Sequence, residues 1–340
     1  MLKPICRLAL MLPLLLASAT SLAQTVIDDR GNRVEITHPV NHIADAWFAH
    51  HSLLMTLGAG DRIVATVNHP ADRPWMFKVQ PSLNQALQAH GKTFASEALV
   101  ARHVDVVFVP ANDPDAQSYH LAGIPVLEMQ FDDFDSMKRS LTTTAAVIGT
   151  PEAQARAVAY NQYLDQQIAS IKAKTQGLTS SQRPTVLHIQ SLHPLKVDGR
   201  NTLIDTWINL AGGRNVAAGI DGNMKPVSPE DVIRWNPDVI IIGAGAGNLA
   251  DSDYAGLFNS VKAVQNHRVW QNPAGVFPWD RYGTEVALQI QWAAAKLHPE
   301  LFPALNINEA TRRFYRQFYQ YPLSAAEADR ILQALPPASR

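Results

Sequence analysis

The longest uninterrupted helical pattern in the chain is PEAQARAVAYNQYLDQQIASIKAKTQGL, residues 151–178, which after Pro151 has no glycine or proline before Gly177. Its apolar side chains recur at steps of three and four residues, the spacing of one helix face, and they are Ala153, Ala157, Tyr160, Leu164, Ile168 and Ile171. Thr150 is typical of a helix N-cap, Pro151 of the first helical position and Gly177 of a C-terminal stop. The segment therefore predicts one helix of about 26 residues and about 40 Å.

Short apolar runs alternate with helical patterns on both sides of this helix. The runs before it are residues 42–45, 62–67, 105–109 and 126–129, and those after it are residues 186–190, 195–197, 238–242 and 268–270. Runs such as VVFV and VIII are apolar on both faces, as parallel strands covered by helices require. The helical patterns between them are residues 52–57, 96–102, 136–148 and 202–210. This alternation predicts α/β layers with parallel sheets, once on each side of the long helix.

We therefore expect an α/β protein of two Rossmann-like lobes joined by a single long α-helix. The expected parts are a leader at residues 1–24, a first lobe at 25–150, the connecting helix at 151–178, a second lobe at 179–302 and a helical extension at 303–340. A chain of 340 residues is long enough for two cores of ordinary size. In the extension, aromatic residues between 314 and 321 recur at helical spacing, which favours packing against a lobe over a partner-binding face. The alternative is one larger domain with the long helix on its surface.

The first residues have the three parts of a secretory signal peptide. Lys3 and Arg7 precede an apolar run at residues 8–16, and SLA at residues 21–23 is a small-x-small cleavage pattern. We expect the mature chain to begin near residue 24 or 25, to be soluble and to reside in the periplasm. The alternative is an uncleaved anchor, for which the apolar run is short.

Composition and motifs exclude several classes of function. The single cysteine, Cys6, lies in the leader, so neither a disulfide scaffold nor a cysteine zinc site is expected. The balance of 29 basic and 30 acidic residues argues against a nucleic-acid partner. GAGAG at 243–247 follows a strand, but Asn248 stands where the dinucleotide fingerprint needs its last glycine. Since HExxH, GxSxG and P-loop motifs are also missing, we expect no enzyme and no cofactor; the alternative is a periplasmic metal-dependent hydrolase assembled from distant loops.

Four stretches of the sequence carry a family pattern. They are TVIDDRGNRVEITHPVNHIADA (25–46), SEALVARHVDVVFV (96–109), LIDTWINLAGGRNVA (203–217) and KPVSPEDVIRWNPDVIII (225–242). In this order they resemble the periplasmic solute-binding proteins that deliver ferric siderophores, cobalamin and related metal complexes to ABC importers. The long helix resembles the rigid connector of that family. A fifth stretch, GVFPWDRYGTEVALQIQWAAAKLHPELF (275–302), is similar to members that handle iron chelates and oxyanions such as molybdate.

The resemblance implies a receptor that captures a solute between its lobes and delivers it to a membrane permease. The first expected ligand is a ferric siderophore or similar iron chelate, the second a molybdate or tungstate oxyanion, and the third a directly bound transition metal. We expect a monomer that closes only modestly, because a stiff helix resists wide hinge motion. The resemblance also implies permease docking through one surface glutamate on each lobe, and Glu97 and Glu230 match those motifs. Both also suit the first turn of a helix, where a carboxylate favours the helix dipole.

The ligand is expected beyond the carboxyl ends of the strands, where open α/β sheets bind their ligands. The strongest candidates are Trp279, Arg281 and Tyr282 in GVFPWDRY, with Asp280 expected to be structural. A guanidinium fits a carboxylate, a catecholate or an oxyanion through two hydrogen bonds. The alternative is a structural loop in which Asp280 and Arg281 pair with neighbours and Trp279 packs.

Further ligand-binding candidates follow other strands. Trp47, His50 and His51 come after the first strand, and a histidine there suits hydrogen bonding to an anion or coordination of iron or nickel. Adjacent histidines are expected to point in different directions, so we do not expect both on one metal. The remaining candidates are Asn68, Arg73 and Trp75 in NHPADRPW and His193 at a later strand end. The alternatives are a helix cap and a surface position for the two histidines, and a plain connection for the Pro-rich loop.

Overall fold

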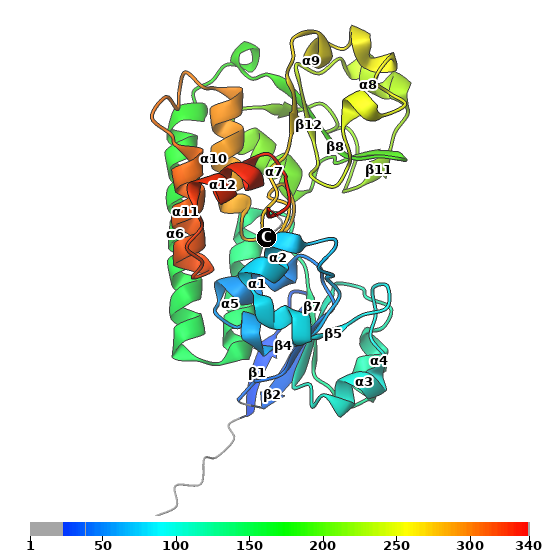
Figure 1. Cartoon of the computed structure of the whole chain (residues 1–340), viewed down its shortest axis with the longest axis vertical. Coiled ribbons are helices and arrows are strands. Elements are labelled where there is room, and N and C mark those ends of the chain that lie inside the picture. The colour runs from blue at the N-terminus through cyan, green and yellow to red at the C-terminus, as the bar shows by residue number, and fades with distance from the viewer. Residues whose placement is uncertain (1–22, 38, 339–340) are drawn as a thin grey trace, which may run out of the picture.

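The computed structural model describes residues 23–37 and 39–338 of the chain. Two α/β lobes lie at opposite ends of the molecule, and one long helix runs along the side of both (Figure 1). The predicted fold class, two lobes joined by a single long helix, is confirmed. The expected signal peptide and Cys6 lie outside the described residues, apart from residues 23 and 24, which begin the first strand. None of the helices in the described ranges combines the length and apolar character that a membrane span needs.

The first lobe is built on a five-stranded parallel sheet. The parallel direction was expected, but the short strand at residues 87–88 was not among the four predicted strands. In sheet order its strands are β5 (Leu87–Gln88), β4 (Ile63–Thr66), β3 (Ile43–Asp45), β6 (Val106–Pro110) and β7 (Val126–Met129). Its helices are α1 (His50–Thr56), α2 (Pro74–Val79), α3 (Ser96–Ala101), α4 (Ala116–Leu121) and α5 (Phe134–Ile148), with 3₁₀ turns at Gly60–Arg62 and Pro81–Gln85. Residues 106–109 of β6 are fully buried, because helices cover both faces of the sheet.

An N-terminal hairpin that the sequence patterns did not predict packs beside this sheet. It consists of β1 (Ala23–Ile27) and β2 (Arg33–Thr37), which pair antiparallel. Asp28 in its turn accepts a hydrogen bond from the backbone N–H of Glu128 in β7 at 3.0 Å, and the N–H of Asp29 donates to the carbonyl of Glu128 at 3.2 Å. Only one residue of each strand is buried, so the alternation that marks a half-buried strand is weak here.

The second lobe contains a six-stranded sheet that corrects one expectation. Its main order is β11 (Lys225–Pro226), β9 (Leu195–Val197), β8 (Thr185–Leu192), β12 (Val239–Ile242) and β13 (Val269–Gln271), and β10 (Arg214–Asn215) pairs with β8. We expected only parallel strands, but β9 runs antiparallel to both β8 and β11. The reason is the two-residue link between β8 and β9, which suits a hairpin and is far too short for a parallel crossover.

The second lobe follows the connecting helix, and its own helices cover its sheet. They are α7 (Leu203–Leu210), α8 (Pro229–Trp235), α9 (Lys262–Gln265) and α10 (Val286–Leu297), with 3₁₀ turns at Ser180–Gln182, Leu249–Asp251 and Leu257–Ser260. The connecting helix α6 (Pro151–Thr175) is confirmed, with Thr150 accepting a cap hydrogen bond from the N–H of Ala153 at 3.2 Å. It ends at Thr175, two residues before the expected stop at Gly177, and its C-cap is Gln176.

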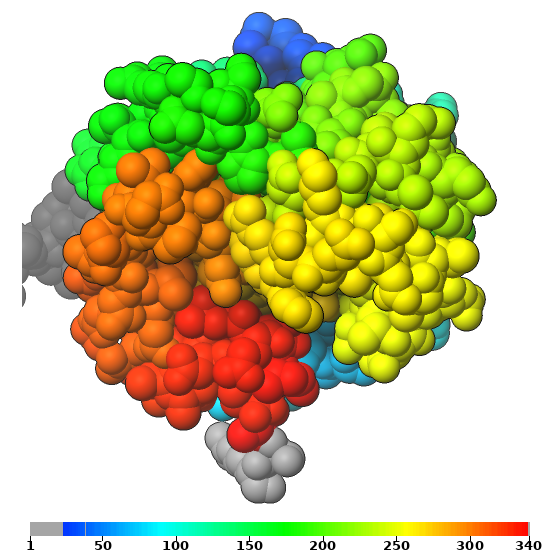
Figure 2. Space-filling model, turned by 90° about the horizontal axis from the view of Figure 1, so that it is seen from above, coloured from blue at the N-terminus to red at the C-terminus, as the bar shows by residue number. Residues whose placement is uncertain are grey.

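The C-terminal extension packs against both lobes. Its helices α11 (Ile307–Phe318) and α12 (Ala325–Leu332) pack beside the connecting helix and the second lobe, where Figure 2 shows the orange and red segments. Four of its aromatic side chains are buried, which confirms packing as their role; they are Phe314, Tyr315, Phe318 and Tyr319. The extension also reaches the first lobe, because Trp75 donates from Nε1 to the carbonyl of Leu335 at 2.9 Å and Lys78 pairs with Glu327 at 2.7 Å.

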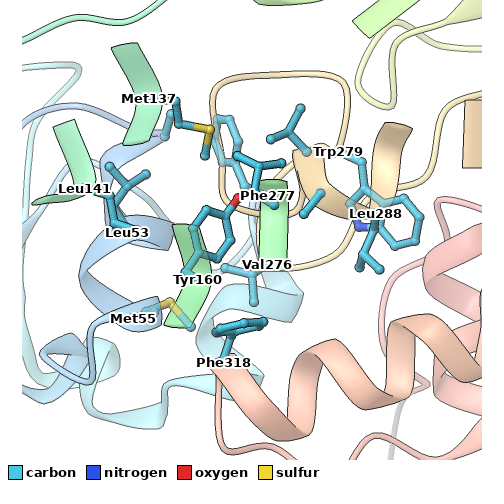
Figure 3. Packing of buried hydrophobic residues seen from close by; sticks show 14 of the residues in the cluster. Leu53, Met55, Met137, Leu141, Tyr160, Val276, Phe277, Trp279, Leu288 and Phe318 are labelled. Carbon is cyan, nitrogen blue, oxygen red and sulfur yellow. The ribbon is translucent and has the colours of Figure 1, made fainter. Parts of the chain in front are cut away.

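One hydrophobic core runs through both lobes. Leu53 of the first lobe, Tyr160 of the connecting helix, Leu288 of the second lobe and Phe318 of the extension belong to the same buried cluster (Figure 3). Each of these side chains is at most 2% exposed. Because burial of apolar surface is the main stabilising term in folding, the lobes are joined by packing as well as by the connecting helix.

Candidate functional site

The loops at the carboxyl ends of the two sheets line a cavity of about 320 Å³ between the lobes. Trp47, Phe48 and Arg73 come from the first lobe, and Gln190 and the loop at residues 277–282 come from the second. Two further cavities, of about 480 and 560 Å³, adjoin it and share lining residues with it. The three form one cleft where the strand ends meet, as expected for an open α/β sheet.

Arg281 lies at the centre of this cleft on the side of the second lobe. Its Nη1 donates to Oε1 of Gln190 at 2.6 Å and lies 3.5 Å from Oδ2 of Asp198. The side chain is 15% exposed, and its guanidinium carbon is 5.7 Å from the centroid of the Tyr282 ring. The guanidinium forms no other hydrogen bond within the described residues, so part of its donor capacity remains open to a ligand.

Arg73 reaches the same cavity from the first lobe. It is the N-cap residue of α2, and its guanidinium carbon lies 5.1 Å from the ring centroid of Phe277 in the second lobe. Its Nη1 donates to the carbonyl of Asp72 at 2.9 Å, whereas its Nε is buried without a partner. Burial lowers the pKa of Arg73 from its ordinary value, although the charges of Asp72 and Asp280 oppose this shift. Two guanidinium groups from opposite lobes therefore line one cavity, which favours an anionic ligand.

Aromatic rings form one wall of the cleft. Trp47 lies 5.2 Å from Phe131 and 6.5 Å from Tyr282, and Phe131 lies 5.7 Å from Tyr282, between ring centroids. The hydroxyl of Tyr282 accepts a hydrogen bond from Nδ2 of Asn223. Burial raises the pKa of Tyr282 to about 12, so its hydroxyl stays protonated at neutral pH. The wall offers flat apolar faces and hydroxyl and amide groups beside the two arginines.

A buried charged triad lies beneath Arg281. His188 in β8 is fully buried, its Nδ1 is 2.8 Å from Oδ2 of Asp198, and its Nε2 is 2.7 Å from Oδ2 of Asp280. Burial opposes a charge on the ring, but the hydrogen bonds and charges of the two aspartates outweigh burial and raise the pKa of His188 to about 9. Asp280 is thus held by His188, and it also lines the central cavity, where its Oδ1 has no hydrogen-bond partner among the described residues.

His50 and His51 do not reach the cleft, contrary to the prediction. Both side chains are fully buried, and both Nδ1 atoms lie 3.1 Å from the same Oδ2 of Asp45, while their Nε2 atoms face two different elements. Their Nε2 atoms meet the hydroxyls of Thr144 at 3.0 Å and Thr66 at 2.7 Å. The reason is that only four residues separate the end of β3 from the start of α1, which folds both rings back onto the aspartate at the strand end.

Trp75 and Trp279 are core residues and not part of the cleft wall. The indole Nε1 of Trp279 donates to Oε1 of the buried Glu285 at 3.0 Å, and the ring is fully buried in the cluster of Figure 3. Trp75 is 2% exposed and is held by the carbonyl of Leu335. A buried indole requires a partner for its N–H, and here each partner lies away from the cleft.

Asn68 and His193 lie at the edges of the site or outside it. Asn68 lines the 560 Å³ cavity, but it is 1% exposed and its Nδ2 donates to the carbonyl of Phe48 at 2.9 Å. His193 is exposed, stacks on Tyr254 with centroids 6.1 Å apart, and lines none of the three cleft cavities. Of the ten predicted ligand-binding residues, the structure thus brings together Trp47, Arg73, Arg281 and Tyr282 around one cavity.

Several residues of the site escaped the sequence analysis. Gln190 and His188 lie within a predicted strand, and the only available signal was a histidine in the apolar run TVLHIQ. Asn223 and Met224 lie in a loop that carries no recognisable pattern. Among residues 23–37 and 39–338, no three His, Cys, Asp or Glu side chains are arranged to hold a metal ion.

The two predicted docking glutamates lie far from the connecting helix. Glu97 is in the first turn of α3 on the first lobe, and Glu230 is in the first turn of α8 on the second lobe. Figure 1 shows both helices on the side of the molecule away from α6. Both side chains are exposed, and neither forms an ion pair within the described part of the chain.

The fold and the cleft between its lobes are those of a solute-binding protein. The sequence profile of the periplasmic binding protein family matches residues 49–274, and the chain belongs to this family. The molybdate-binding protein MolA of Haemophilus influenzae is 29% identical over 116 residues, which is 32% of each chain. A cobalamin-binding protein of Halobacterium salinarum is 27% identical over 172 residues, 50% of this chain and 46% of that protein. The alignments thus span about a third to a half of these relatives' length.

Solved structures share the fold over nearly the whole chain. A periplasmic solute-binding protein of Veillonella parvula has a TM-score of 0.78 and 24% identity, covering 92% of this chain and 97% of that one. The structure of MolA with bound molybdate has a TM-score of 0.77 and 18% identity, covering 88% and 99%. CeuE of Helicobacter pylori with bound Ni(II) has a TM-score of 0.72 and 18% identity, covering 91% and 99%. At these identities the likeness establishes the fold.

Proposed function

We propose that this protein is the receptor of an ABC importer and that it binds an anionic solute between its lobes. The proposal rests on one observation, which is that Arg73 of the first lobe and Arg281 of the second line the same cavity. A ligand that contacts both guanidinium groups connects the two lobes, and its negative charge is balanced on both sides. The protein binds and releases this solute without changing it.

An anionic iron chelate is the first proposed ligand. Catecholate and carboxylate oxygens of a ferric siderophore suit the guanidinium groups, and its organic backbone suits the rings of Trp47 and Tyr282. The cavities on either side of the central one give room for a ligand larger than a simple ion.

A molybdate or tungstate oxyanion is the second candidate. The central cavity of about 320 Å³ is lined by both guanidinium groups, so a small anion could contact both without using the two adjoining cavities. The likeness to MolA supports it. A directly bound transition metal is third, since the two arginines repel a bare cation. A metal-dependent hydrolase stays a distant alternative.

Delivery to a permease completes the proposed function. We propose that the chain acts in the periplasm as a monomer after removal of a leader at residues 1–24. The bound receptor then docks on basic residues of the permease through Glu97 on one lobe and Glu230 on the other. Their exposure, without an ion pair in the described residues, supports this role, because the carboxylates are free to meet a partner.

The test is a thermal-shift screen of the chain from Thr25 onward. Its probes are a ferric tris-catecholate, a ferric hydroxamate, cobalamin, molybdate, tungstate and Ni²⁺. A ligand of the native state raises the melting temperature, and we expect the ferric tris-catecholate to do so. Arg281→Ala is expected to weaken that binding about tenfold to a hundredfold, since a charged hydrogen bond is lost, with an unchanged melting temperature of the free protein.

Arg316→Ala is the matched control, because Arg316 is exposed on α11 outside the cleft. Stabilisation by Ni²⁺ alone, or equal binding by the Arg281→Ala variant, contradicts an anion site. If the ligand-free Arg281→Ala variant has a clearly lower melting temperature as well as a lower affinity, the result supports the structural alternative for this loop.

A further inference from the structure

We propose that the buried His188 is a positioning residue of the ligand site, which holds Asp198 and Asp280 and so keeps Arg281 available to an anionic ligand. This inference rests on the proposed binding of an anion in the cleft. It assigns a function to a histidine that has no contact with solvent and lies in the middle of a strand.

The hydrogen-bond geometry around His188 favours its imidazolium form. Its two ring nitrogens lie 2.8 Å and 2.7 Å from carboxylate oxygens of Asp198 and Asp280. An ionised carboxylate only accepts hydrogen bonds, so both ring nitrogens must donate, and only the imidazolium form carries two N–H groups. A neutral ring would place a lone pair against one of the two carboxylates. The triad therefore holds one positive and two negative charges in the core.

This arrangement leaves Arg281 without a tight ion pair. Oδ2 of Asp198 is already bound to His188, and its Oδ1 accepts from the N–H of Met224 at 2.8 Å. Arg281 lies 3.5 Å from that carboxylate, and its short contact, at 2.6 Å, is to the neutral amide of Gln190. The position of the Arg281 guanidinium is thus fixed by an uncharged partner, and Asp198 leaves some of its N–H donors free for a ligand.

The surroundings keep the triad rigid. The ring of Trp207 meets His188 edge to face, with centroids 6.0 Å apart, and its Nε1 donates to the backbone carbonyl of Asp280 at 3.2 Å. Since Asp280 precedes Arg281 directly, the triad and Trp207 together determine where the Arg281 backbone lies. A side chain held in this way loses little conformational entropy on binding a ligand.

The charges explain the effect on ligand binding. The positive charges of His188 and Arg281 equal the negative charges of the two carboxylates, so Arg73 gives the cavity a net positive charge, and the open donors of Arg281 still face the ligand. Loss of the imidazolium charge would leave an extra negative charge beneath the cleft and repel an anion. Loss of the Asp280 charge would act in the opposite direction. If the triad were only structural, loss of either charge would change the ligand affinity in the same direction.

The experiment compares His188→Asn and Asp280→Asn by calorimetric titration with molybdate and with a ferric tris-catecholate. We expect His188→Asn to weaken binding about tenfold and Asp280→Asn, which keeps an acceptor for His188, to strengthen it several-fold. His298→Asn is the control, since His298 is also buried but bonds to the carbonyl of Gly212 outside the cleft. Its affinity is expected to match that of the unmodified protein.

A second measurement does not depend on folding of the variants. In protein labelled with ¹⁵N-histidine, the ring nitrogens of His188 are expected to show imidazolium shifts at pH 7. A neutral ring, or weaker binding by both variants, overturns the inference while the anion site stands. Absence of binding of either anion by the unmodified protein overturns the proposed function and this inference with it.

Discussion

The Oγ1 atoms of Thr56 and Thr284 lie 2.8 Å apart in the core, although Thr56 ends α1 of the first lobe and Thr284 precedes α10 of the second. The N–H of Thr284 also donates to Oγ of Ser52 at 3.1 Å, and its carbonyl accepts from the hydroxyl of Tyr160 in the connecting helix at 2.7 Å. The lobes are therefore joined by a buried polar seam as well as by a shared core. This seam supports the expectation that ligand binding closes the cleft only modestly.

Thr284→Val is expected to lower the free energy of unfolding by about 1–3 kcal/mol, because the hydroxyls of Thr56 and Tyr319 lose a buried partner. Urea unfolding measures the change. Thr37→Val, at the exposed end of β2, is expected to stay within about 0.5 kcal/mol of the unmodified protein. If both substitutions lowered the free energy of unfolding equally, the buried hydrogen bonds between the lobes would make no specific contribution to stability.

Arg73→Ala is expected to weaken binding of the anionic ligand about tenfold or more without lowering stability. The guanidinium is largely desolvated and its Nε has no partner, so its removal takes away an unfavourable burial. Arg156→Ala is the contrasting variant, because Arg156 bonds to the carbonyls of Thr56 and Phe318 away from the cleft. It is expected to lose stability and to keep its affinity. Titration calorimetry and urea unfolding of both variants check the prediction.

The buried Glu285 is expected to make stability depend on pH. Burial raises the pKa of Glu285 from 4.5 to about 7, in spite of hydrogen bonds from Trp279, Tyr315 and two backbone N–H groups. The folded state thus binds a proton between pH 4.5 and pH 7 that the unfolded state has released. The contribution of this group to stability is complete below about pH 4.5 and is lost as the pH rises to about 7.

Glu285→Gln removes this titration. The stability of the unmodified protein relative to this variant is expected to be greater at pH 5 than at pH 8, by on the order of 2–3 kcal/mol. Urea unfolding at both pH values measures the difference. Glu152→Gln, on the exposed first turn of α6, is the control. A difference that is the same at both pH values would show that Glu285 is ionised throughout.

Glu97→Gln and Glu230→Gln are each expected to reduce solute uptake several-fold in cells that lack their own receptor, because each removes one charge from the proposed contact with the permease. Ligand affinity is expected to be unchanged, since both residues lie outside the three cleft cavities. Glu152→Gln again serves as control, as another exposed glutamate in the first turn of a helix. Normal uptake by both variants would argue against docking through these residues.

Local patterns predicted the elements of the fold because helices and strands depend on neighbouring residues. The bounds of β7 and β9 agree with the predicted runs at 126–129 and 195–197, and α6 begins at Pro151 as expected. The antiparallel direction of β9 could not be predicted in this way, because strand direction depends on which strand it pairs with. The N-terminal hairpin was missed because its strands bury one residue each.

The candidate site depends on which partner each side chain meets in the folded chain, whether that partner is near or far in the sequence. Trp279 and Arg281 are two residues apart, yet Trp279 is held in the core by Glu285 and Arg281 lies in the cleft beside Gln190. Their spacing in the sequence does not show which of the two is buried and which reaches the cleft. For His188, an isolated histidine in an apolar strand gave no indication that Asp198 and Asp280 would enclose it.

Local patterns were sufficient to predict the two α/β lobes and the long connecting helix, because periodicity and capping residues are properties of neighbouring positions, and the order of the motifs carried the resemblance to the family. The folded chain was needed to show that Arg73 and Arg281 line the same cavity and that His50, His51, Trp75 and Trp279 do not. Burial and hydrogen-bond partners are set by packing in the folded chain, often between segments far apart in the sequence, as Arg73 and Phe277 are, and this packing selects which polar groups remain available to a ligand.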